Sequence, residues 1–106
     1  MGRNYLGEFE ELVLLSVAVN SGEAYAAAIT GELKERTGRE VSLSAVHIAL
    51  YRLEEKGLVT SQVGGATAVR GGRRKRLFAI TALGSAALAE IRQIRESYWQ
   101  LIPKPL

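Results

Sequence analysis

The chain has 106 residues, a mass of 11.5 kDa and a formal net charge of +3, with 47% hydrophobic and 24% charged residues. A chain of this length and composition forms one small globular domain, whose modest core is consistent with association between copies. It contains no cysteine and one histidine. This composition excludes a disulfide framework, thiol chemistry and a typical zinc or haem site.

No segment is typical of membrane insertion or export. The longest apolar run, residues 12–19, is interrupted by Ser16 and is far shorter than the roughly 20 residues that span a bilayer. The start of the chain lacks the basic flank and the long apolar region of a signal peptide. We therefore expect a cytoplasmic protein.

The positive charge is concentrated in one short segment. Residues 1–69 carry six basic and nine acidic residues, a net charge of −3, and residues 77–106 carry three and two, a net charge of +1. The remaining +5 lies in residues 70–76, which contain no acidic residue. Such an asymmetry is typical of a surface that binds a polyanion at one place.

Two helices are predicted in the first third of the chain. Residues 6–20 begin with acidic residues, which suit a helix N-terminus, and carry apolar residues on more than one face. That distribution fits a central helix and equally one that also packs on a partner. Residues 23–36 follow, with Tyr25, Ile29 and Leu33 as the expected buried stripe and Gly38 as the stop.

A third helix is predicted over residues 43–56. Ser42 and Ser44 are candidate caps, apolar residues recur at helical spacing, and Gly57 ends the segment. Its short connection to the second helix is typical of a helix-turn-helix. The face opposite the apolar stripe is uncharged in its first half and comprises Ser44, Ala45, His47, Ile48 and Tyr51.

Residues 58–81 are predicted to form a β-hairpin. Two strand-like segments, 58–63 and 76–81, flank a glycine-rich stretch that carries the basic residues. A neutral helix followed by a basic hairpin is typical of a winged helix, in which the helix enters the major groove of DNA and the hairpin contacts the backbone.

The last predicted helix begins after Thr81 and runs to about Leu101. Its apolar residues approximate a heptad seam: Leu83, Ala87, Ile91, Ile94, Tyr98 and Leu101. Since the rest of the chain has little surface left to cover this stripe, we expect a homodimer interface that also includes the exposed side of the first helix. The alternative is a helix that folds back on its own domain.

Four segments, taken in this order, resemble the PadR family of bacterial transcriptional regulators over nearly the whole chain. They are LGEFEELVLLSVAV, AYAAAITGELKERTGREVSL, ALYRLEEKGLV and GGRRKRLFAITALGSAAL. The resemblance implies a winged-helix dimer that represses transcription, with the single C-terminal helix as the dimer element. The chain departs from the family pattern at Ser44, His47, Ile48 and Tyr51 on the exposed face of the third helix. These differences leave the operator sequence open.

We therefore predict a mainly α fold with a small β-hairpin, in which a winged helix-turn-helix (residues 1–81) and a C-terminal dimerisation helix (residues 82–106) form one domain. The predicted function is sequence-specific regulation of transcription, as a repressor that binds a palindromic operator as a homodimer. The predicted contacts to double-stranded DNA are Ser42, Ser44, Ala45, His47, Ile48, Tyr51, Arg70, Arg73, Arg74, Lys75 and Arg76. The predicted dimer interface comprises Phe9, Leu12, Leu83, Ala87, Ile91, Ile94, Tyr98, Trp99 and Leu101. By the same resemblance, a flat aromatic effector is expected to bind near Trp99 and Phe9.

Catalysis and a cofactor are not expected. The sequence has no Ser-His-Asp set and no evident carboxylate pair, and its glycine-rich stretch lacks the lysine and serine of a phosphate-binding loop. The alternative to DNA binding is a winged helix that contacts a protein, with the basic hairpin on an acidic partner. Only the DNA interpretation predicts a preference for one duplex sequence.

Overall fold

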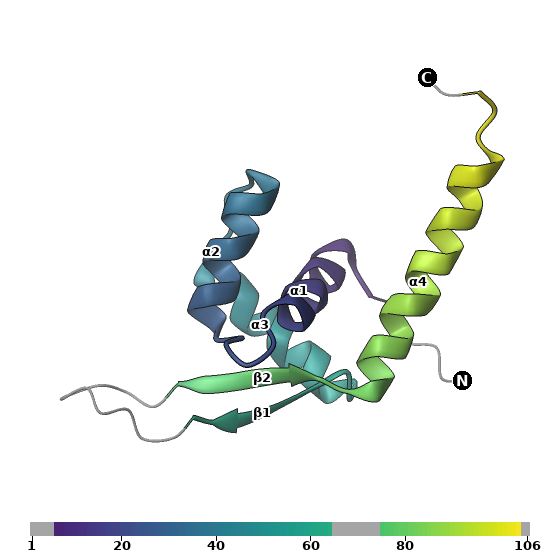
Figure 1. Ribbon diagram of the computed structural model, residues 1–106. Helices are drawn as coiled ribbons and strands as arrows, with labels where there is room; N and C mark the ends of the chain where they lie inside the picture. Colours follow the sequence, from purple (N-terminus) through teal and green to yellow (C-terminus); the bar gives the residue numbers. More distant parts are fainter. Residues whose placement is uncertain (1–5, 65–74, 105–106) are drawn as a thin grey trace.

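The computed structural model describes residues 6–64 and 75–104 (Figure 1). Three helices are followed by an antiparallel strand pair and a long C-terminal helix, which confirms the predicted mainly α fold with a small β-hairpin. The elements are α1 (Glu8–Val19), α2 (Ala26–Thr37), α3 (Leu43–Glu55), β1 (Val59–Val63), β2 (Arg76–Ile80) and α4 (Ala82–Leu101). We refer to α1, α2, α3, β1 and β2 together as the body.

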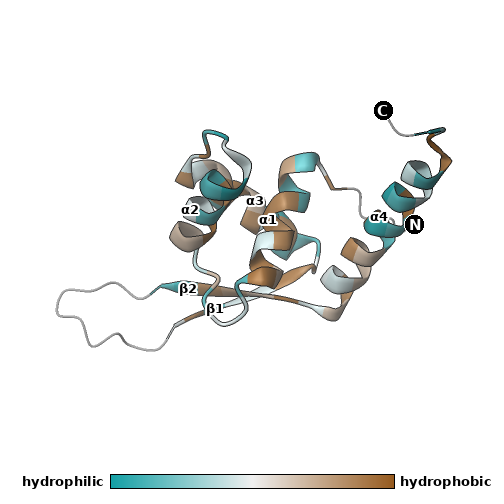
Figure 2. Ribbon diagram, turned by 45° about the horizontal axis from the view of Figure 1, so that its top comes forward, coloured by the Kyte–Doolittle hydropathy of each residue, from teal (hydrophilic) through white to brown (hydrophobic). Residues whose placement is uncertain are grey.

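The core of the body lies where α1, α2 and α3 meet above the strand pair, and hydrophobic residues line these facing surfaces (Figure 2). Its largest fully buried side chain is Phe78 of β2. The helices contribute Val13, Leu14, Val17, Ile29, Leu33, Val46, Ala49, Leu50 and Leu53. Burying one such aliphatic side chain contributes roughly 1.5–3 kcal/mol, so this cluster is the main source of stability.

Helix α3 begins at Leu43, as its sequence predicts, and ends at Glu55, one residue before the predicted end. The Ser42 hydroxyl accepts a hydrogen bond from the Ala45 N–H at 3.1 Å, which satisfies one of the free donors of the first turn. Ser44 is not a second cap, because it already lies inside the helix. At the other end Gly57 has a φ of 78°, a left-handed conformation that side chains with a Cβ disfavour.

Helix α2 begins later than predicted, at Ala26 instead of about residue 23. The preceding segment pairs with β2: Tyr25 forms a β-bridge with Leu77, and the Phe78 N–H donates to the Ala24 carbonyl at 3.0 Å. Because these backbone groups are used by the sheet, they cannot also form a helical turn. Tyr25 is therefore the half-buried residue before the helix and not the first member of its buried stripe.

The start of α4 is joined closely to the strand pair. Strands β1 and β2 are antiparallel, with Val59 opposite Ile80 and Val63 opposite Arg76. Thr81 caps α4 by accepting from the Gly84 N–H at 3.0 Å, and it donates to the Gly57 carbonyl at 2.7 Å. A Cβ on Gly84 would overlap the carbonyl oxygen of Leu58, so only glycine allows this approach.

Acidic residues at the start of α1 connect it to three other parts of the chain. Each carboxylate forms an ion pair at 2.7 Å with a cation distant in sequence. The pairs are Glu8 with Arg39 before α3, Glu10 with Lys56 after α3, and Glu11 with Arg95 of α4. The pair of Glu10 and Lys56 is better shielded from water than a typical surface pair, because its side chains are 13% and 30% exposed, whereas Arg95 is 59% exposed.

A polar cluster connects the end of α1 to α2. The buried Ser16 hydroxyl donates to Glu32 Oε1 at 2.5 Å, and the Asn20 amide donates to the same oxygen at 3.2 Å. Arg36 Nε lies 3.2 Å from Glu32 Oε2. The Ser16 hydrogen bond is the largest cause that holds the pKa of the Glu32 carboxyl below its ordinary value, and the bonds from Arg36 and Asn20 act in the same direction.

Helix α4 projects from the body, and its last turn extends away from the other elements (Figure 1). Gly84 is its only buried residue. Ala87, Leu88 and Ile91 are half-buried, whereas the apolar residues of the outer half are exposed. None of the helices in residues 6–64 and 75–104 combines the length and the hydropathy that a membrane span requires.

Candidate nucleic-acid interface

The outward face of α3 is a line of exposed side chains. An α-helix turns about 100° per residue, so the residues directly opposite the buried stripe are Ser44, Ile48, Tyr51 and Glu55, all of which are exposed. Ile48 is 53% and Tyr51 is 55% exposed. We call these four residues the outer line of α3.

The outer line is neutral over its first two turns and charged only at its end. Residues 42–51 contain no charged side chain, whereas Arg52 and Glu55 follow in the last turns. Arg52 is also directed toward α1, because its Nη1 lies 3.8 Å from Glu10 Oε2. The first half of α3 can therefore approach a flat polar surface closely without burying a charge.

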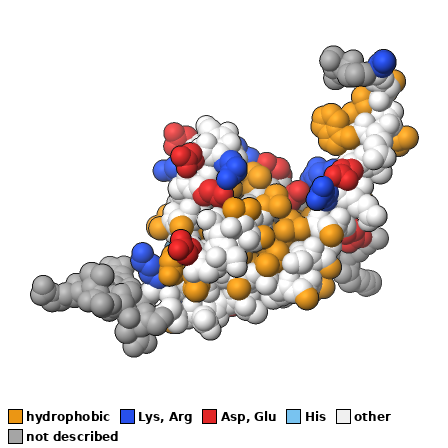
Figure 3. Space-filling view, in the orientation of Figure 1, with side chains coloured by type: hydrophobic (Ala, Val, Ile, Leu, Met, Phe, Trp, Pro, Cys, Tyr) orange, Lys and Arg blue, Asp and Glu red, His pale blue; other side chains and the backbone are white. Residues whose placement is uncertain are grey.

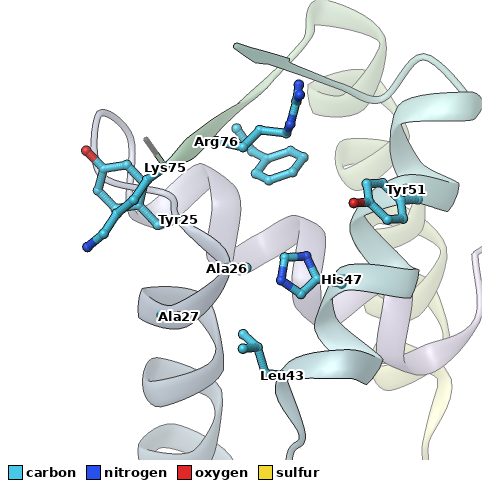
Figure 4. Close-up of a pocket in the computed structure, with 9 residues that line it drawn as sticks. Tyr25, Ala26, Ala27, Leu43, His47, Tyr51, Lys75 and Arg76 are labelled. Carbon is cyan, nitrogen blue, oxygen red and sulfur yellow. The ribbon is translucent and has the colours of Figure 1, made fainter. Parts of the chain in front are cut away.

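A groove of about 570 Å³ lies beside α3, between that helix, the start of α2 and strand β2 (Figure 4). Leu43, His47 and Tyr51 project into it from α3, and His47 is half-buried there. The other lining residues are Tyr25, Ala26, Ala27, Lys75, Arg76 and Phe78. The groove thus has an apolar floor with aromatic, hydroxyl and cationic groups around it.

Two exposed cations, Lys75 and Arg76, stand at the edge of this groove. Lys75 Nζ lies 5.2 Å from the centre of the Tyr25 ring, a cation–π distance. Arg76 Nη1 donates to the Ser61 hydroxyl at 3.0 Å, and that hydroxyl donates to Glu54 of α3 at 2.8 Å. These contacts position both cations next to the neutral face of α3, as a phosphate backbone beside a major groove requires.

The structure brings together most, but not all, of the residues predicted to contact DNA. Ser44, His47, Ile48, Tyr51, Lys75 and Arg76 lie on the outer line or around the groove, with Ser42 at the start of α3. Ala45 lies on another side of α3, where it lines a hollow with Phe9, Arg39 and Val41. Arg70, Arg73 and Arg74 lie outside the described residues.

Two residues of the groove, Tyr25 and Leu43, are not among those predicted from the sequence. Periodicity places Tyr25 in a buried helical stripe, and its position at the groove follows from its bridge to Leu77, which no periodicity in the sequence indicates. Leu43 is 47% exposed, although its spacing to Val46 and Leu50 is that of a core residue.

A second surface runs along α4, and Figure 3 shows hydrophobic side chains between α4 and the body and on the outer half of α4. Its most exposed members are Leu83 (52%), Ile94 (50%), Tyr98 (69%), Trp99 (71%) and Leu101 (77%). The predicted interface residues Phe9, Leu12 and Ala87 are instead half-buried and pack against the core of their own chain, and Ile91 is half-buried as well. We call the five exposed apolar residues Leu83, Ile94, Tyr98, Trp99 and Leu101 the α4 stripe.

Trp99 and Phe9, predicted to line one effector pocket, line separate hollows within one chain. Trp99 belongs to a hollow of about 430 Å³ between α1 and α4, together with Leu15, Leu88 and Arg95. Phe9 belongs to the hollow beside Ala45. Among residues 6–64 and 75–104, no group of three or more histidine, cysteine, aspartate or glutamate side chains could hold a metal ion.

Comparison with known proteins identifies the fold and the family. The model of the transcriptional regulator PadR-like family matches residues 14–90. A PadR family transcription regulator from a hypervirulent Clostridium difficile strain has a TM-score of 0.71 at 22% identity, over 90% of this chain and 94% of that chain. Bacillus subtilis PadR, crystallised in complex with operator DNA, has a TM-score of 0.65 at 19% identity, over 93% of this chain and 50% of that chain.

A PadR-like regulator from Bacillus cereus has a TM-score of 0.67 at 18% identity, over 92% of this chain and 93% of that chain. At these identities each structure supports the shared fold, while the family rests on the match to residues 14–90. No curated protein matches the chain.

Proposed function

This chain belongs to the PadR-like family of DNA-binding transcriptional regulators, and from this premise we propose that it is a repressor that binds a palindromic operator as a homodimer. The observation that carries the proposal is the neutral outer line of α3 next to the exposed cations Lys75 and Arg76. Membership of this family also means that the chain is a regulator and not an enzyme.

Each half of the proposed complex uses α3 and β2 differently. The first turns of α3 enter the major groove, where Ser44, Ile48 and Tyr51 meet base edges. Lys75 and Arg76 contact the flanking phosphates, which fixes the position of the helix without contributing sequence preference. The groove beside α3 leaves room for the sugar-phosphate strand between these two sets of residues.

The α4 stripe supports the proposed homodimer. Five large apolar side chains of α4, each at least half exposed, project from a 20-residue helix, an arrangement that is costly in water unless another surface covers it. Their spacing approximates the heptad seam of paired helices. To bind two half-sites of a palindrome, the symmetric pair that we propose has to present its two α3 helices about one helical turn of DNA apart, roughly 34 Å.

The proposed effector remains a separate prediction, because Phe9 and Trp99 share no hollow within one chain. An effector bound beside Trp99 would change the angle between α4 and the body and so the spacing of the two α3 helices. Titration with flat aromatic compounds while Trp99 fluorescence is recorded tests this. A saturable change is expected, and no change with any compound leaves Trp99 as a packing residue only.

The proposed function is tested by selecting a preferred sequence from random duplexes and measuring its affinity by fluorescence anisotropy against a scrambled duplex. We expect a preference of at least ~10³-fold that weakens with salt. Replacing both Lys75 and Arg76 by alanine should weaken binding to all duplexes. It should also reduce the salt slope by roughly 0.9 for each phosphate that the protein no longer neutralises.

The matched control is Lys34→Ala, which removes an exposed cation from the C-terminal half of α2, whereas the groove is lined by the N-terminal end of that helix. It should leave both the affinity and the salt slope unchanged. Equal, weak binding to every duplex would contradict the proposal and favour the alternative, in which the basic hairpin contacts an acidic protein.

A further inference from the structure

Ile48 occupies the centre of the outer line of α3, although the fold gives it no packing role there. Its side chain is 53% exposed, whereas Val46, Ala49 and Leu50 on either side of it in sequence are 0–3% exposed. An aliphatic side chain at the most outward position of a surface helix contributes little to folding. Its chemistry is available to whatever α3 meets.

The surrounding side chains limit what α3 can recognise. Residues 42–51 contain no arginine, lysine, asparagine or glutamine, the side chains that form paired hydrogen bonds to guanine or adenine. Ser42 already accepts the capping bond from Ala45, and His47 is half-buried in the groove beside Tyr25 and Arg76. On the outer line before Glu55, only the hydroxyls of Ser44 and Tyr51 accompany Ile48.

The charges decide which part of α3 lies against the bases. Glu55 lies on the same outer line, one helical turn beyond Tyr51, and its carboxylate would be repelled by the phosphates on both sides of a major groove. The C-terminal end of the outer line is therefore held away from the duplex and the N-terminal half approaches it. In that orientation Ile48 is the central residue at the base edges.

In the major groove, the C5-methyl group of thymine is the apolar group that distinguishes one base pair from the others. We propose that Ile48 packs on a thymine methyl, so that the operator half-site is an A·T-containing sequence with thymine at the base pair that faces Ile48. Recognition at that base pair rests on burial of a methyl group and not on hydrogen bonds. The proposal rests on the proposed DNA binding and names the class of sequence bound.

The test replaces each thymine of the selected operator, one at a time, by deoxyuridine, which lacks only the C5-methyl group. At one position in each half-site, we expect the full-length protein to bind roughly fourfold more weakly, the factor that burial of one methyl group contributes. Every other thymine-to-uridine change should have no effect on affinity.

Two variants of α3 connect the effect to one side chain. Ile48→Ala should bind the thymine duplex more weakly and should no longer distinguish thymine from uridine. Leu43→Ala is the matched control, because it truncates an aliphatic side chain of similar exposure that lies on the groove side of the same helix. This control should keep the fourfold ratio, and thermal unfolding verifies that both variants are folded.

The possible results separate this proposal from the proposed function. A preferred operator without any uridine effect, or with an effect that persists in Ile48→Ala, overturns the thymine contact and leaves sequence-specific binding intact. If no duplex is preferred over any other, both proposals fail. A uridine effect that disappears in Ile48→Ala and persists in Leu43→Ala supports the thymine contact.

Discussion

Helices α3 and α4 carry the same kind of sequence pattern but meet very different surroundings. Each begins at a hydroxyl cap, Ser42 or Thr81, and each carries an apolar stripe at helical spacing. In α3 the apolar stripe is buried in the core of the body. In α4 only Gly84 is buried, and the α4 stripe is exposed. An amphipathic pattern thus specifies a helix and one apolar face, but not whether the same chain covers that face.

The largest expected effect distinguishes the buried face of α3 from its exposed face by stability. Leu50→Ala removes a fully buried side chain of α3 and should lower the free energy of unfolding by about 2–5 kcal/mol in urea titrations. Ile48→Ala, two residues away on the exposed face, should change it by less than about 0.5 kcal/mol. Equal losses in the two variants would mean that α3 is not packed as described.

The second prediction concerns the close approach of the start of α4 to the body at Gly84. Gly84→Ala places a Cβ against the Leu58 carbonyl oxygen and 2.8 Å from Cγ1 of Ile80, so it should cost about 1–3 kcal/mol in unfolding free energy. Ser85→Ala, at an exposed neighbouring position, is the control and should have no measurable effect. A stable Gly84→Ala protein with an unchanged melting temperature would contradict this junction.

The third prediction concerns a feature that the two helices share. Ser42→Ala should cost about 1 kcal/mol through loss of the cap. Thr81→Ala should cost more, because Thr81 also donates to the Gly57 carbonyl. Ser42→Asp and Thr81→Ser keep a capping oxygen and should retain most of the stability in the same urea titrations. A loss as large with these conservative variants would exclude capping as the cause.

The smallest effect is a pH dependence at the contact between α1 and α2. The pKa of Glu32 is lower in the folded chain than its ordinary value of 4.5, first because of the Ser16 hydroxyl. Its contribution is therefore complete at neutral pH and is lost as the pH falls below about 4.5. Because its pair with Arg36 is open to water, Glu32→Gln should cost under about 1 kcal/mol.

Melting temperatures of wild type and Glu32→Gln between pH 3 and 7 test this prediction. The difference between the two proteins should be constant near neutrality and should shrink in acid. Glu35→Gln, at an exposed position of the same helix, is the matched control, because it removes a carboxylate and leaves the Ser16 contact intact. A difference that grows as the pH falls would contradict the assigned direction of the pKa shift.

The sequence predicted those parts of the fold that local chemistry determines. The cap at Ser42, the left-handed glycines 38 and 57, and the cap at Thr81 all mark helix ends in the structure. The start of α2 was predicted too early, because a backbone bridge between Tyr25 and Leu77 joins residues far apart in sequence. Such pairing is set by tertiary structure and has no local signal.

The candidate site was only partly predictable for a related reason. Helical periodicity correctly placed Ile48 and Tyr51 on the outer face of α3, but it could not show that Ala45 lies toward Phe9 or that Tyr25 and Leu43 line the groove. Likewise, the sequence predicted the helical spacing of the apolar residues of α4. The half-burial of Phe9 and Leu12 by their own core depends on packing between elements.

The contrast between α3 and α4 is tested most directly by the mass of the complex on one selected operator duplex, measured by sedimentation velocity. We predict that two chains of 11.5 kDa bind each duplex, and that Ile94→Asp in the α4 stripe leaves a folded monomer that binds far more weakly. One chain per duplex at saturation, or wild-type affinity for Ile94→Asp, would contradict the assignment of α4 to a second copy.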